Sequence, residues 1–243
     1  MTKTTEKWYA SWFDTPYYHI LYKDRDYTEA QAFMDNLTNY LNLPENGKIL
    51  DLACGKGRHS IYLNKLGYNV TGVDLSEQSI THAKQYENDS LKFDVHDMTK
   101  PYTETFDAVF NLFTSFGYFE NEETNARVLK NFKLGLRENG HVVIDFLNLS
   151  KVRAELIPNH EILKKGVKYK IEKRITNQFI IKDINVIDGD NQYAFQEKVQ
   201  ALDLEKFERY SREAGLEIVK IFGDYSLNDF SKESSDRLIL VLQ

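Results

Sequence analysis

Hydrophobic positions along the chain follow two different patterns, and the change between them falls near residue 150. Between Lys48 and Leu147, short apolar runs of strand length alternate with segments whose apolar residues recur at helical spacing. This alternation predicts a parallel sheet with right-handed crossovers and helices on both faces. The predicted strands are Lys48–Ala53, Asn69–Asp74, a run from Leu91–Phe93 onward, Phe106–Phe113 and His141–Leu147, and the predicted helices are His59–Leu66, one capped at Ser76, and Asn121–Arg137.

After residue 150 the pattern becomes that of an antiparallel meander, which we interpret as an insertion. Three strand-like runs, Val167–Thr176, Gln178–Ile187 and Gln192–Leu202, are joined by short segments of turn-forming residues. A helix capped at Asp203 follows. The last two strands, Glu217–Phe222 and Arg237–Leu242, are expected to pair antiparallel at the edge of the main sheet.

The N-terminal segment is rich in aromatic residues and precedes a helix. Its aromatic residues are Trp8, Tyr9, Trp12, Phe13, Tyr17, Tyr18 and Tyr22. The helix has apolar residues at helical spacing from Ala30 to Leu41, and Leu43-Pro44 ends it. The aromatic segment could close over a ligand as a lid or anchor the chain as a hydrophobic plug, and we favour the lid.

Together these patterns predict an α/β fold. We expect a doubly wound, mostly parallel seven-stranded sheet with an antiparallel last strand, plus an N-terminal helical lid and a small antiparallel β-meander insertion. The predicted divisions are residues 1–45 for the aromatic and helical cap, 46–150 for the ligand-binding core, 151–202 for the β insertion, and 203–243 for the helix and strands that complete the core sheet.

Composition and charge narrow the functional classes. The 243 residues are 42% hydrophobic, and their formal net charge of −6 gives no overall basic field for a nucleic acid. Residues 151–200 hold ten Lys or Arg against seven Asp or Glu, a mildly basic strip more typical of a solvated face. No apolar stretch reaches the roughly 20 residues that a membrane span needs, and the N-terminus lacks the hydrophobic region of a secretory signal.

The chain has one cysteine, Cys54. A single cysteine excludes an intramolecular disulfide and a cysteine-built zinc site. No spacing of His, Asp and Glu indicates a bound metal, so none is expected. A cytoplasmic location fits this cysteine usage.

The segment from Ile49 to Ser60 carries the strongest indication of function. Gly55 and Gly57 stand in the turn between a predicted strand and a predicted helix, where the lack of a side chain lets the backbone approach a ligand. Asp51 ends the first strand and Asp74 ends the second. A carboxylate at the second strand tip can accept hydrogen bonds from both hydroxyls of a ribose. The sequence therefore predicts a nucleoside ligand at the carboxyl edge of the sheet.

The same segment favours one nucleoside cofactor over another. A dinucleotide site needs Gly-x-Gly-x-x-Gly, but Ala53 and Arg58 stand at the first and third glycine positions. Asp51 would repel a pyrophosphate and attract a ligand that carries an ammonium and a sulfonium group. Both departures favour S-adenosylmethionine over a nicotinamide dinucleotide.

Residues 48–147 resemble the class I, Rossmann-like S-adenosylmethionine-dependent methyltransferases, with the motifs in the same order. Leu-Asp-Leu-Ala-Cys-Gly-Lys-Gly (50–57) resembles the family's first motif, with Ala53 in place of the commoner glycine, and Gly-Val-Asp-Leu-Ser (72–76) resembles its second-strand acidic motif. Asp97-Met98 is similar to the position that meets adenine, and Phe106–Phe113 resembles the fourth-strand motif that borders the transferred methyl. The candidate cofactor-binding residues are Tyr22, Asp51, Ala53, Cys54, Gly55, Gly57, Asp74, Leu75, Asp97, Met98, Asn111 and Phe113.

The acceptor end of the site depends on two other segments. Loops after strands carry the reacting centre in doubly wound sheets, and Tyr118 lies in the segment after the fourth strand. Tyr17–Tyr22 resembles the tyrosine-bearing start of the N-terminal helix that closes over the cofactor in this family. Tyr18, His19 and Tyr118 are therefore the candidate catalytic residues.

The resemblance implies an enzyme that moves the methyl group of S-adenosylmethionine to a small-molecule acceptor by direct displacement and releases S-adenosylhomocysteine. The alternatives are a methyltransferase for RNA or protein, a non-catalytic S-adenosylmethionine-binding protein, and a nicotinamide enzyme. We expect a monomer or a homodimer with no membrane partner. The fold does not encode the identity of the acceptor.

Overall fold

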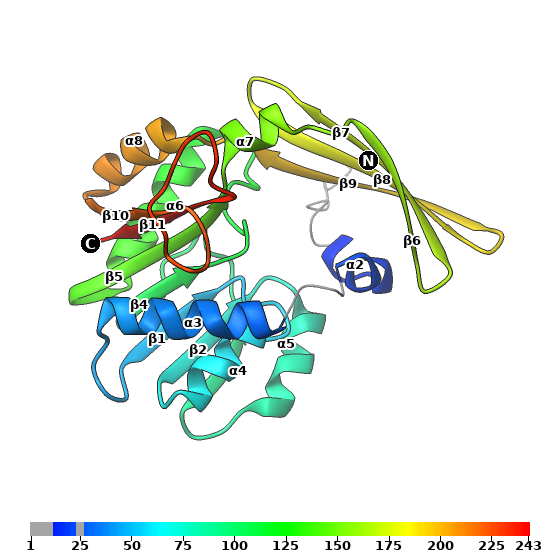
Figure 1. Ribbon diagram of the computed structural model, residues 1–243. Coiled ribbons are helices and arrows are strands. Elements are labelled where there is room, and N and C mark those ends of the chain that lie inside the picture. Colours follow the sequence, from blue (N-terminus) through cyan, green and yellow to red (C-terminus); the bar gives the residue numbers. More distant parts are fainter. Residues whose placement is uncertain (1–11, 23–26) are drawn as a thin grey trace, which may run out of the picture. The chain divides into compact units, whose positions relative to one another are not determined.

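The computed structural model describes residues 12–22 and 27–243 (Figure 1). The chain divides into two compact units, which we call the core unit (residues 26–151 and 202–243) and the β unit (residues 1–25 and 152–201). The predicted cap of residues 1–45 is thus shared between the units, because helix α3 (Tyr27–Leu41) packs into the hydrophobic cluster of the core unit. No described helix is long and apolar enough to cross a membrane.

The core unit is built on a seven-stranded sheet in the order β10-β11-β5-β4-β1-β2-β3. Strands β1 to β5 pair in parallel, and β11 is antiparallel to both of its neighbours, β5 and β10. This confirms the predicted sheet and its antiparallel last strand. The strands are β1 (Lys48–Leu52), β2 (Asn69–Asp74), β3 (Leu91–Val95), β4 (Phe106–Asn111), β5 (Leu136–Leu147), β10 (Ile218–Phe222) and β11 (Arg237–Leu242).

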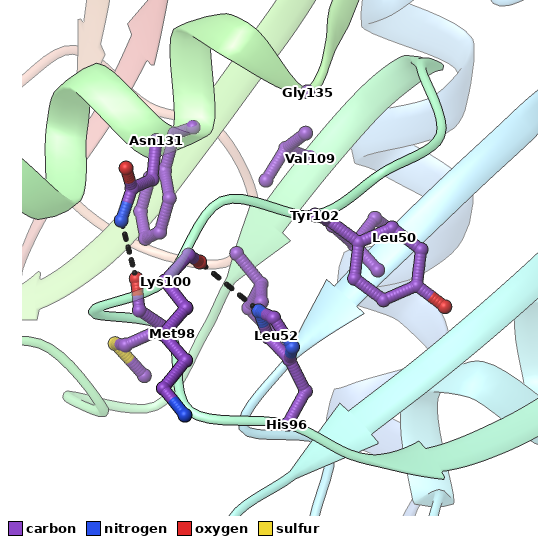
Figure 2. A pocket seen from close by; sticks show the side chains of 10 residues that line it. Leu50, Leu52, His96, Met98, Lys100, Tyr102, Val109, Asn131 and Gly135 are labelled. Atoms are coloured by element: carbon purple, nitrogen blue, oxygen red, sulfur yellow. Dashed lines mark hydrogen bonds between the residues drawn. The ribbon is translucent and has the colours of Figure 1, made fainter.

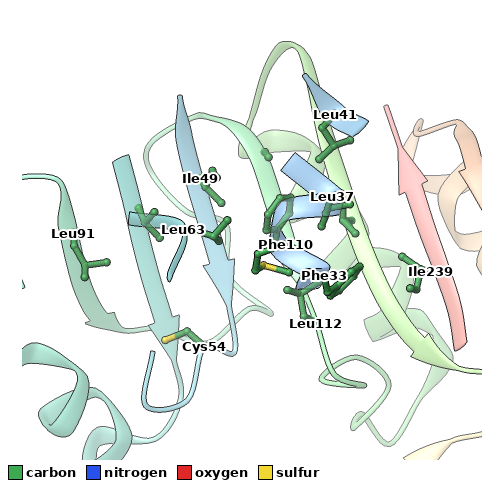
Figure 3. Close-up of a cluster of buried hydrophobic side chains, with 14 of the residues drawn as sticks. Phe33, Leu37, Leu41, Ile49, Cys54, Leu63, Leu91, Phe110, Leu112 and Ile239 are labelled. Atoms are coloured by element: carbon green, nitrogen blue, oxygen red, sulfur yellow. The ribbon is translucent and has the colours of Figure 1, made fainter. Parts of the chain in front are cut away.

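Helices cover both faces of this sheet, as the alternating pattern predicted. Helices α3, α4 and α5 share one buried cluster with strand side chains that include Ile49 and Phe110 (Figure 3). Successive strand residues point to opposite faces, and Leu50 and Val109 lie with Phe132 of α6 on the other face. After α3, the helices are α4 (Arg58–Lys65), α5 (Glu77–Ala83), the 3-10 turn η1 (Lys84–Tyr86), α6 (Glu122–Leu134), α7 (Leu149–Ala154) and α8 (Leu204–Ala214).

Element boundaries follow local signals where these exist. Ser76 begins α5 and Asp203 begins α8, and each side chain accepts a hydrogen bond from the main-chain N–H three residues later. The predicted start of β5 at His141 is wrong, because the strand begins at Leu136. Leu136 pairs with Phe106 of β4. The sequence did not indicate this part of the strand, because residues 137–139 are polar and exposed.

The β unit contains a four-stranded antiparallel sheet in the order β6-β7-β8-β9. The strands are β6 (Asn159–Lys164), β7 (Val167–Ile175), β8 (Phe179–Asp188) and β9 (Asn191–Gln200). The sequence predicted only the last three of these strands. β6 is a short edge strand, and its Leu163 is 73% exposed. The strand was missed because its apolar residues do not alternate with its polar ones.

The described part of the aromatic N-terminal segment packs into the core of the β unit. It includes α2 (Pro16–Leu21), and Trp12 is only 1% exposed. The Trp12 ring packs with Tyr169 in one buried cluster, and its Nε1 donates a hydrogen bond to Glu197 (2.8 Å). Trp8 and Tyr9 lie outside the described residues. Whether the segment closes over a ligand remains a prediction.

Trp12→Ala should strongly destabilise the β unit. Removing a buried tryptophan side chain costs about 3–5 kcal/mol, since it leaves a cavity and loses the transfer free energy of the ring. Urea denaturation followed by circular dichroism measures the loss. Leu163→Ala in the same unit is the control, because the Leu163 side chain is 73% exposed and its loss should change the free energy of unfolding little. Equal effects of the two changes would contradict this account of the segment.

Candidate functional site

The turn between β1 and α4 contains three residues in the left-handed conformation, Ala53 (φ 64°), Gly55 (φ 57°) and Gly57 (φ 81°). A Cβ on Gly57 would lie 2.6 Å from the ring of Phe93, so packing alone requires glycine there. At Gly55 no atom lies within 4 Å of the Cβ position, so the main chain is open to a ligand. Ala53 adopts its conformation at a cost of about 1–2 kcal/mol. Of the two glycines in this turn, Gly55 is therefore the one whose main chain a ligand can approach.

Asp74 ends β2 and connects two neighbouring turns. Its Oδ2 accepts a hydrogen bond from the main-chain N–H of Gly55 (2.8 Å), and its Oδ1 accepts one from the N–H of Ser76 (2.8 Å). The half-buried carboxylate is thus fixed at the carboxyl edge, in the position from which it can accept from a diol. The adjacent Leu75 is 36% exposed.

Asp51 lies in β1, directly before the same turn, and is only 1% exposed. The pKa of Asp51 is raised to about 6, chiefly because the group is buried. A hydrogen bond from the Ser60 hydroxyl lowers this pKa, and the nearby Asp74 carboxylate raises it. The Ser60 Oγ lies 2.6 Å from the Asp51 Oδ2. Two neighbouring carboxylates make this end of β1 and β2 electronegative, which favours a cationic ligand.

Cys54 follows these residues in the turn and is buried. Burial raises the pKa of the Cys54 thiol well above its usual value, and the Asp51 and Asp74 carboxylates raise it further. The thiol is therefore neutral near pH 7 and is not activated as a nucleophile.

The end of β4 lies against the end of β1. Asn111 is fully buried, and its Nδ2 donates a hydrogen bond to the carbonyl oxygen of Leu52 (3.1 Å). Its Oδ1 is buried without a hydrogen-bond partner among the described residues. The half-buried Phe113 stacks on His59 with the ring centroids 5.5 Å apart, and the Arg58 guanidinium carbon lies 4.7 Å from the Phe113 centroid. Phe113 is thus brought beside the residues that follow the glycine turn.

Three residues near the end of β4 were not predicted as parts of the site. Asp145 of β5 is fully buried, and its carboxylate accepts a hydrogen bond from the N–H of Phe113 (2.9 Å). Tyr225 and Arg237 both donate hydrogen bonds to the Asp145 carboxylate. A charged residue inside the apolar run Val142–Leu147 was the signal for Asp145, because such residues are rarely buried without partners. No local pattern indicated the other two.

The loop after β3 carries Asp97 and Met98. Asp97 forms a turn in which its Oδ1 accepts from the N–H of Thr99 (3.0 Å). Met98 lines a cavity with Leu50 and Asn131, and the Asn131 Nδ2 donates to the Met98 carbonyl (3.1 Å; Figure 2). This cavity lies on the sheet face that α6 covers. Of the predicted cofactor-binding residues it includes Met98, and it includes neither Gly55 nor Asp74.

The candidate residues of the N-terminal segment make their described contacts inside the β unit. The Tyr22 hydroxyl donates to the Glu197 carboxylate (2.7 and 2.9 Å) and accepts from Lys182. The Tyr18 ring contacts the rings of Tyr22 and His19 with centroids 4.9 and 5.4 Å apart. Tyr118 belongs to the core unit and is half-buried in the segment after β4. The catalytic roles of Tyr18, His19 and Tyr118, and the cofactor contact of Tyr22, remain predictions.

The core unit thus gathers an open glycine, two carboxylates and an aromatic ring at the carboxyl edge of its sheet. A ribose diol and a cationic group suit this set of partners. Among the described residues no group of three His, Cys, Asp or Glu could hold a metal ion.

Comparisons with known proteins agree with this arrangement. Residues 49–140 match the methyltransferase domain family. YqeM of Bacillus subtilis, a protein classed as a methyltransferase, is 27% identical over 229 residues, which cover 88% of this chain and 92% of YqeM. The dTDP-3-amino-3,4,6-trideoxy-alpha-D-glucopyranose N,N-dimethyltransferase of Streptomyces venezuelae is 29% identical over 132 residues, 53% of this chain and 54% of that enzyme.

The fold is shared with solved structures. An S-adenosylmethionine-dependent methyltransferase from Clostridium acetobutylicum superimposes with a TM-score of 0.79 at 20% identity, covering 93% of this chain and 95% of that chain. At this identity the similarity shows the common fold alone.

Asp74→Asn should weaken the binding of S-adenosylhomocysteine, because it removes the negative charge from the acceptor. The core should stay folded, since the amide oxygen still accepts one main-chain hydrogen bond. We expect an affinity loss of about 1.5–3 kcal/mol, the range for a hydrogen bond to a charged group. Isothermal titration calorimetry measures it. Asp94→Asn removes the same charge from an exposed position on the neighbouring strand β3 and should leave the affinity unchanged. An unchanged affinity in folded Asp74→Asn would remove Asp74 from the site.

The affinity for S-adenosylhomocysteine should also depend on the ionisation of Asp51. The pKa of Asp51 is raised to about 6, so its carboxylate is mostly charged at pH 7 and becomes neutral as the pH falls through 6. The attraction for the ligand's ammonium group should therefore weaken between pH 7 and pH 5. Asp51→Asn should bind more weakly at pH 7 and lose this pH dependence. The same slope in both proteins would show that another group is responsible.

Proposed function

We propose that the chain is a class I S-adenosylmethionine-dependent methyltransferase that methylates a small-molecule acceptor by direct displacement. The observation that carries the cofactor assignment is the carboxylate of Asp74 beside the open main chain of Gly55, at the end of the first two parallel strands. The match of residues 49–140 to the methyltransferase domain family covers both residues.

The residues at the carboxyl edge fit this cofactor. Asp74 would hold the ribose hydroxyls, and Gly55 would let the ligand lie against the main chain. The paired charges of Asp51 and Asp74 suit the ammonium and sulfonium groups. Asn111 has a buried Oδ1 that still lacks a donor among the described residues, at the strand tip next to the glycine turn.

Bound S-adenosylmethionine supplies a methyl group that is already activated by its sulfonium leaving group. The protein therefore has to position the reactants and exclude water, and it needs no covalent intermediate. Asp74 and the glycine turn would hold the nucleoside end of the cofactor. The Phe113 ring offers an apolar surface at the end of β4. A general base is needed only if the acceptor keeps a proton at neutral pH, and Tyr18, His19 and Tyr118 are the residues we propose for contact with the acceptor.

The relatives support a small-molecule acceptor. The Streptomyces venezuelae relative is by name an N,N-dimethyltransferase of a dTDP-linked amino sugar, so an amino group on a sugar is the first acceptor to test. The net charge of −6 disfavours a broad RNA-binding surface. We further propose a cytoplasmic enzyme, on the basis of its single cysteine, that acts as a monomer or a homodimer.

Incubation of the chain with methyl-labelled S-adenosylmethionine and a metabolite extract should place label on a compound in the small-molecule fraction. Parallel reactions with RNA and with protein fractions distinguish the other acceptor classes, and dTDP-linked amino sugars are tested individually. Label that enters only RNA or protein would overturn the small-molecule proposal.

Two glycine variants serve as matched controls for this reaction. Gly55→Val places a branched side chain in the open space of the glycine turn and should abolish label transfer. Gly67→Val makes the same change at another left-handed glycine (φ 98°) with open space around it, and it lies beyond the far end of α4. We expect it to retain transfer in the folded protein.

A further inference from the structure

The chain leaves β4 through two consecutive non-glycine residues in the left-handed region, Phe113 (φ 59°) and Thr114 (φ 58°). This conformation is unfavourable for bulky and β-branched residues, because Cβ approaches the following carbonyl oxygen. Such strain persists only where surrounding contacts hold it, and it collects at functional sites. The contacts that hold this turn are therefore informative.

Asp145 of β5 holds both strained residues. Its Oδ2 accepts a hydrogen bond from the N–H of Phe113 (2.9 Å), and its main-chain carbonyl oxygen accepts one from the N–H of Thr114 (2.9 Å). Asp145 is fully buried, so water does not compete for these bonds. One residue thus fixes the direction in which the main chain leaves β4.

Arg237 and Tyr225 hold Asp145 in turn. The Arg237 Nε donates to the Asp145 Oδ1 (2.7 Å), and the Tyr225 hydroxyl donates to its Oδ2 (3.1 Å). The Arg237 Nη2 also donates to the Thr114 Oγ1 (2.9 Å), so the guanidinium contacts both the buried carboxylate and the strained turn. The Asp145 carboxylate therefore has a partner for each oxygen and a compensating charge.

The result of this arrangement is the placement of the Phe113 ring. It stacks with His59 (centroids 5.5 Å apart) and with Tyr225 (5.7 Å), each at an interplanar angle of 29°. His59 and Arg58 directly follow Gly57, and Arg58 also contacts the ring. The turn that Asp145 fixes thus sets an aromatic side chain against the first turn of α4, beside the proposed cofactor site.

We propose that Asp145, Arg237 and Tyr225 are positioning residues that hold Phe113 as part of the wall of the cofactor site. None of the three needs to contact the cofactor, since they act through the placement of the Phe113 ring. This inference rests on the proposed function and names the residues that fix the position of one side chain in the cofactor site.

A double-mutant cycle on the affinity for S-adenosylhomocysteine tests the proposal. Tyr225→Phe keeps the stacked ring and removes only the hydroxyl, so we expect a loss of about two- to tenfold, the effect of one hydrogen bond. Phe113→Ala should lower the affinity as well. If Tyr225 acts through Phe113, the Tyr225→Phe change should cause no further loss in the Phe113→Ala protein.

The matched control is Tyr62→Phe in the same unit. The Tyr62 hydroxyl donates to both carboxylate oxygens of Asp35 on α3 (3.0 Å each), and Asp35 is not one of the residues that hold Phe113 and Thr114. Its loss should leave the affinity unchanged. Thermal unfolding of every variant verifies that binding is measured on folded protein.

Two results would overturn the positioning role. The first is an unchanged affinity in Tyr225→Phe, and the second is an equal loss in the presence and absence of the Phe113 ring, which would indicate an independent structural effect. An unaltered chain that does not bind S-adenosylhomocysteine would instead overturn the proposed function, and with it this inference.

Discussion

Parallel pairing of β4, β1, β2 and β3 is the constraint on which the site depends, because it places the turns after these strands at one edge of the sheet. Two side-chain contacts connect those turns. Asp74 joins the glycine turn to the turn after β2, and Asn111 joins the end of β4 to the end of β1. Leu52 and Asn111, about 60 positions apart in the chain, thereby become neighbours. The main chain of Gly55 in the nearby glycine turn stays open.

The same edge combines two kinds of electrostatic environment. Around Asp51 and Cys54, burial and neighbouring negative charge raise both pKa values, so this region is electronegative. Around Asp145, a buried carboxylate is fully paired with a guanidinium and a hydroxyl. The first environment gains from a bound cation. The second is complete in itself, which suits a part of the site that serves as a rigid support.

The sequence predicted the parts of the fold and of the site that are encoded locally. The strand, glycine turn and helix that contain Asp51, Gly55 and Gly57 lie within a few residues of one another, and Asp74 follows at the next strand tip, so spacing alone located them. Arg237 and Tyr225 could not be located in this way. The pairing of β11 with β5 brings Arg237 to Asp145, and Tyr225 reaches it from the loop between β10 and β11. β6 was missed for a related reason, since an edge strand with one covered face has a weak hydrophobic pattern.

The contact between Trp12 and Glu197 has a consequence for synthesis. The two residues are 185 positions apart, so at about 5–20 residues per second the indole waits about 10–40 s for its partner to leave the ribosome. Until then the apolar surface of this segment has no sheet to cover it. Because contacts between distant positions form late, the Trp12 ring reaches its buried position only after most of the chain has been synthesised.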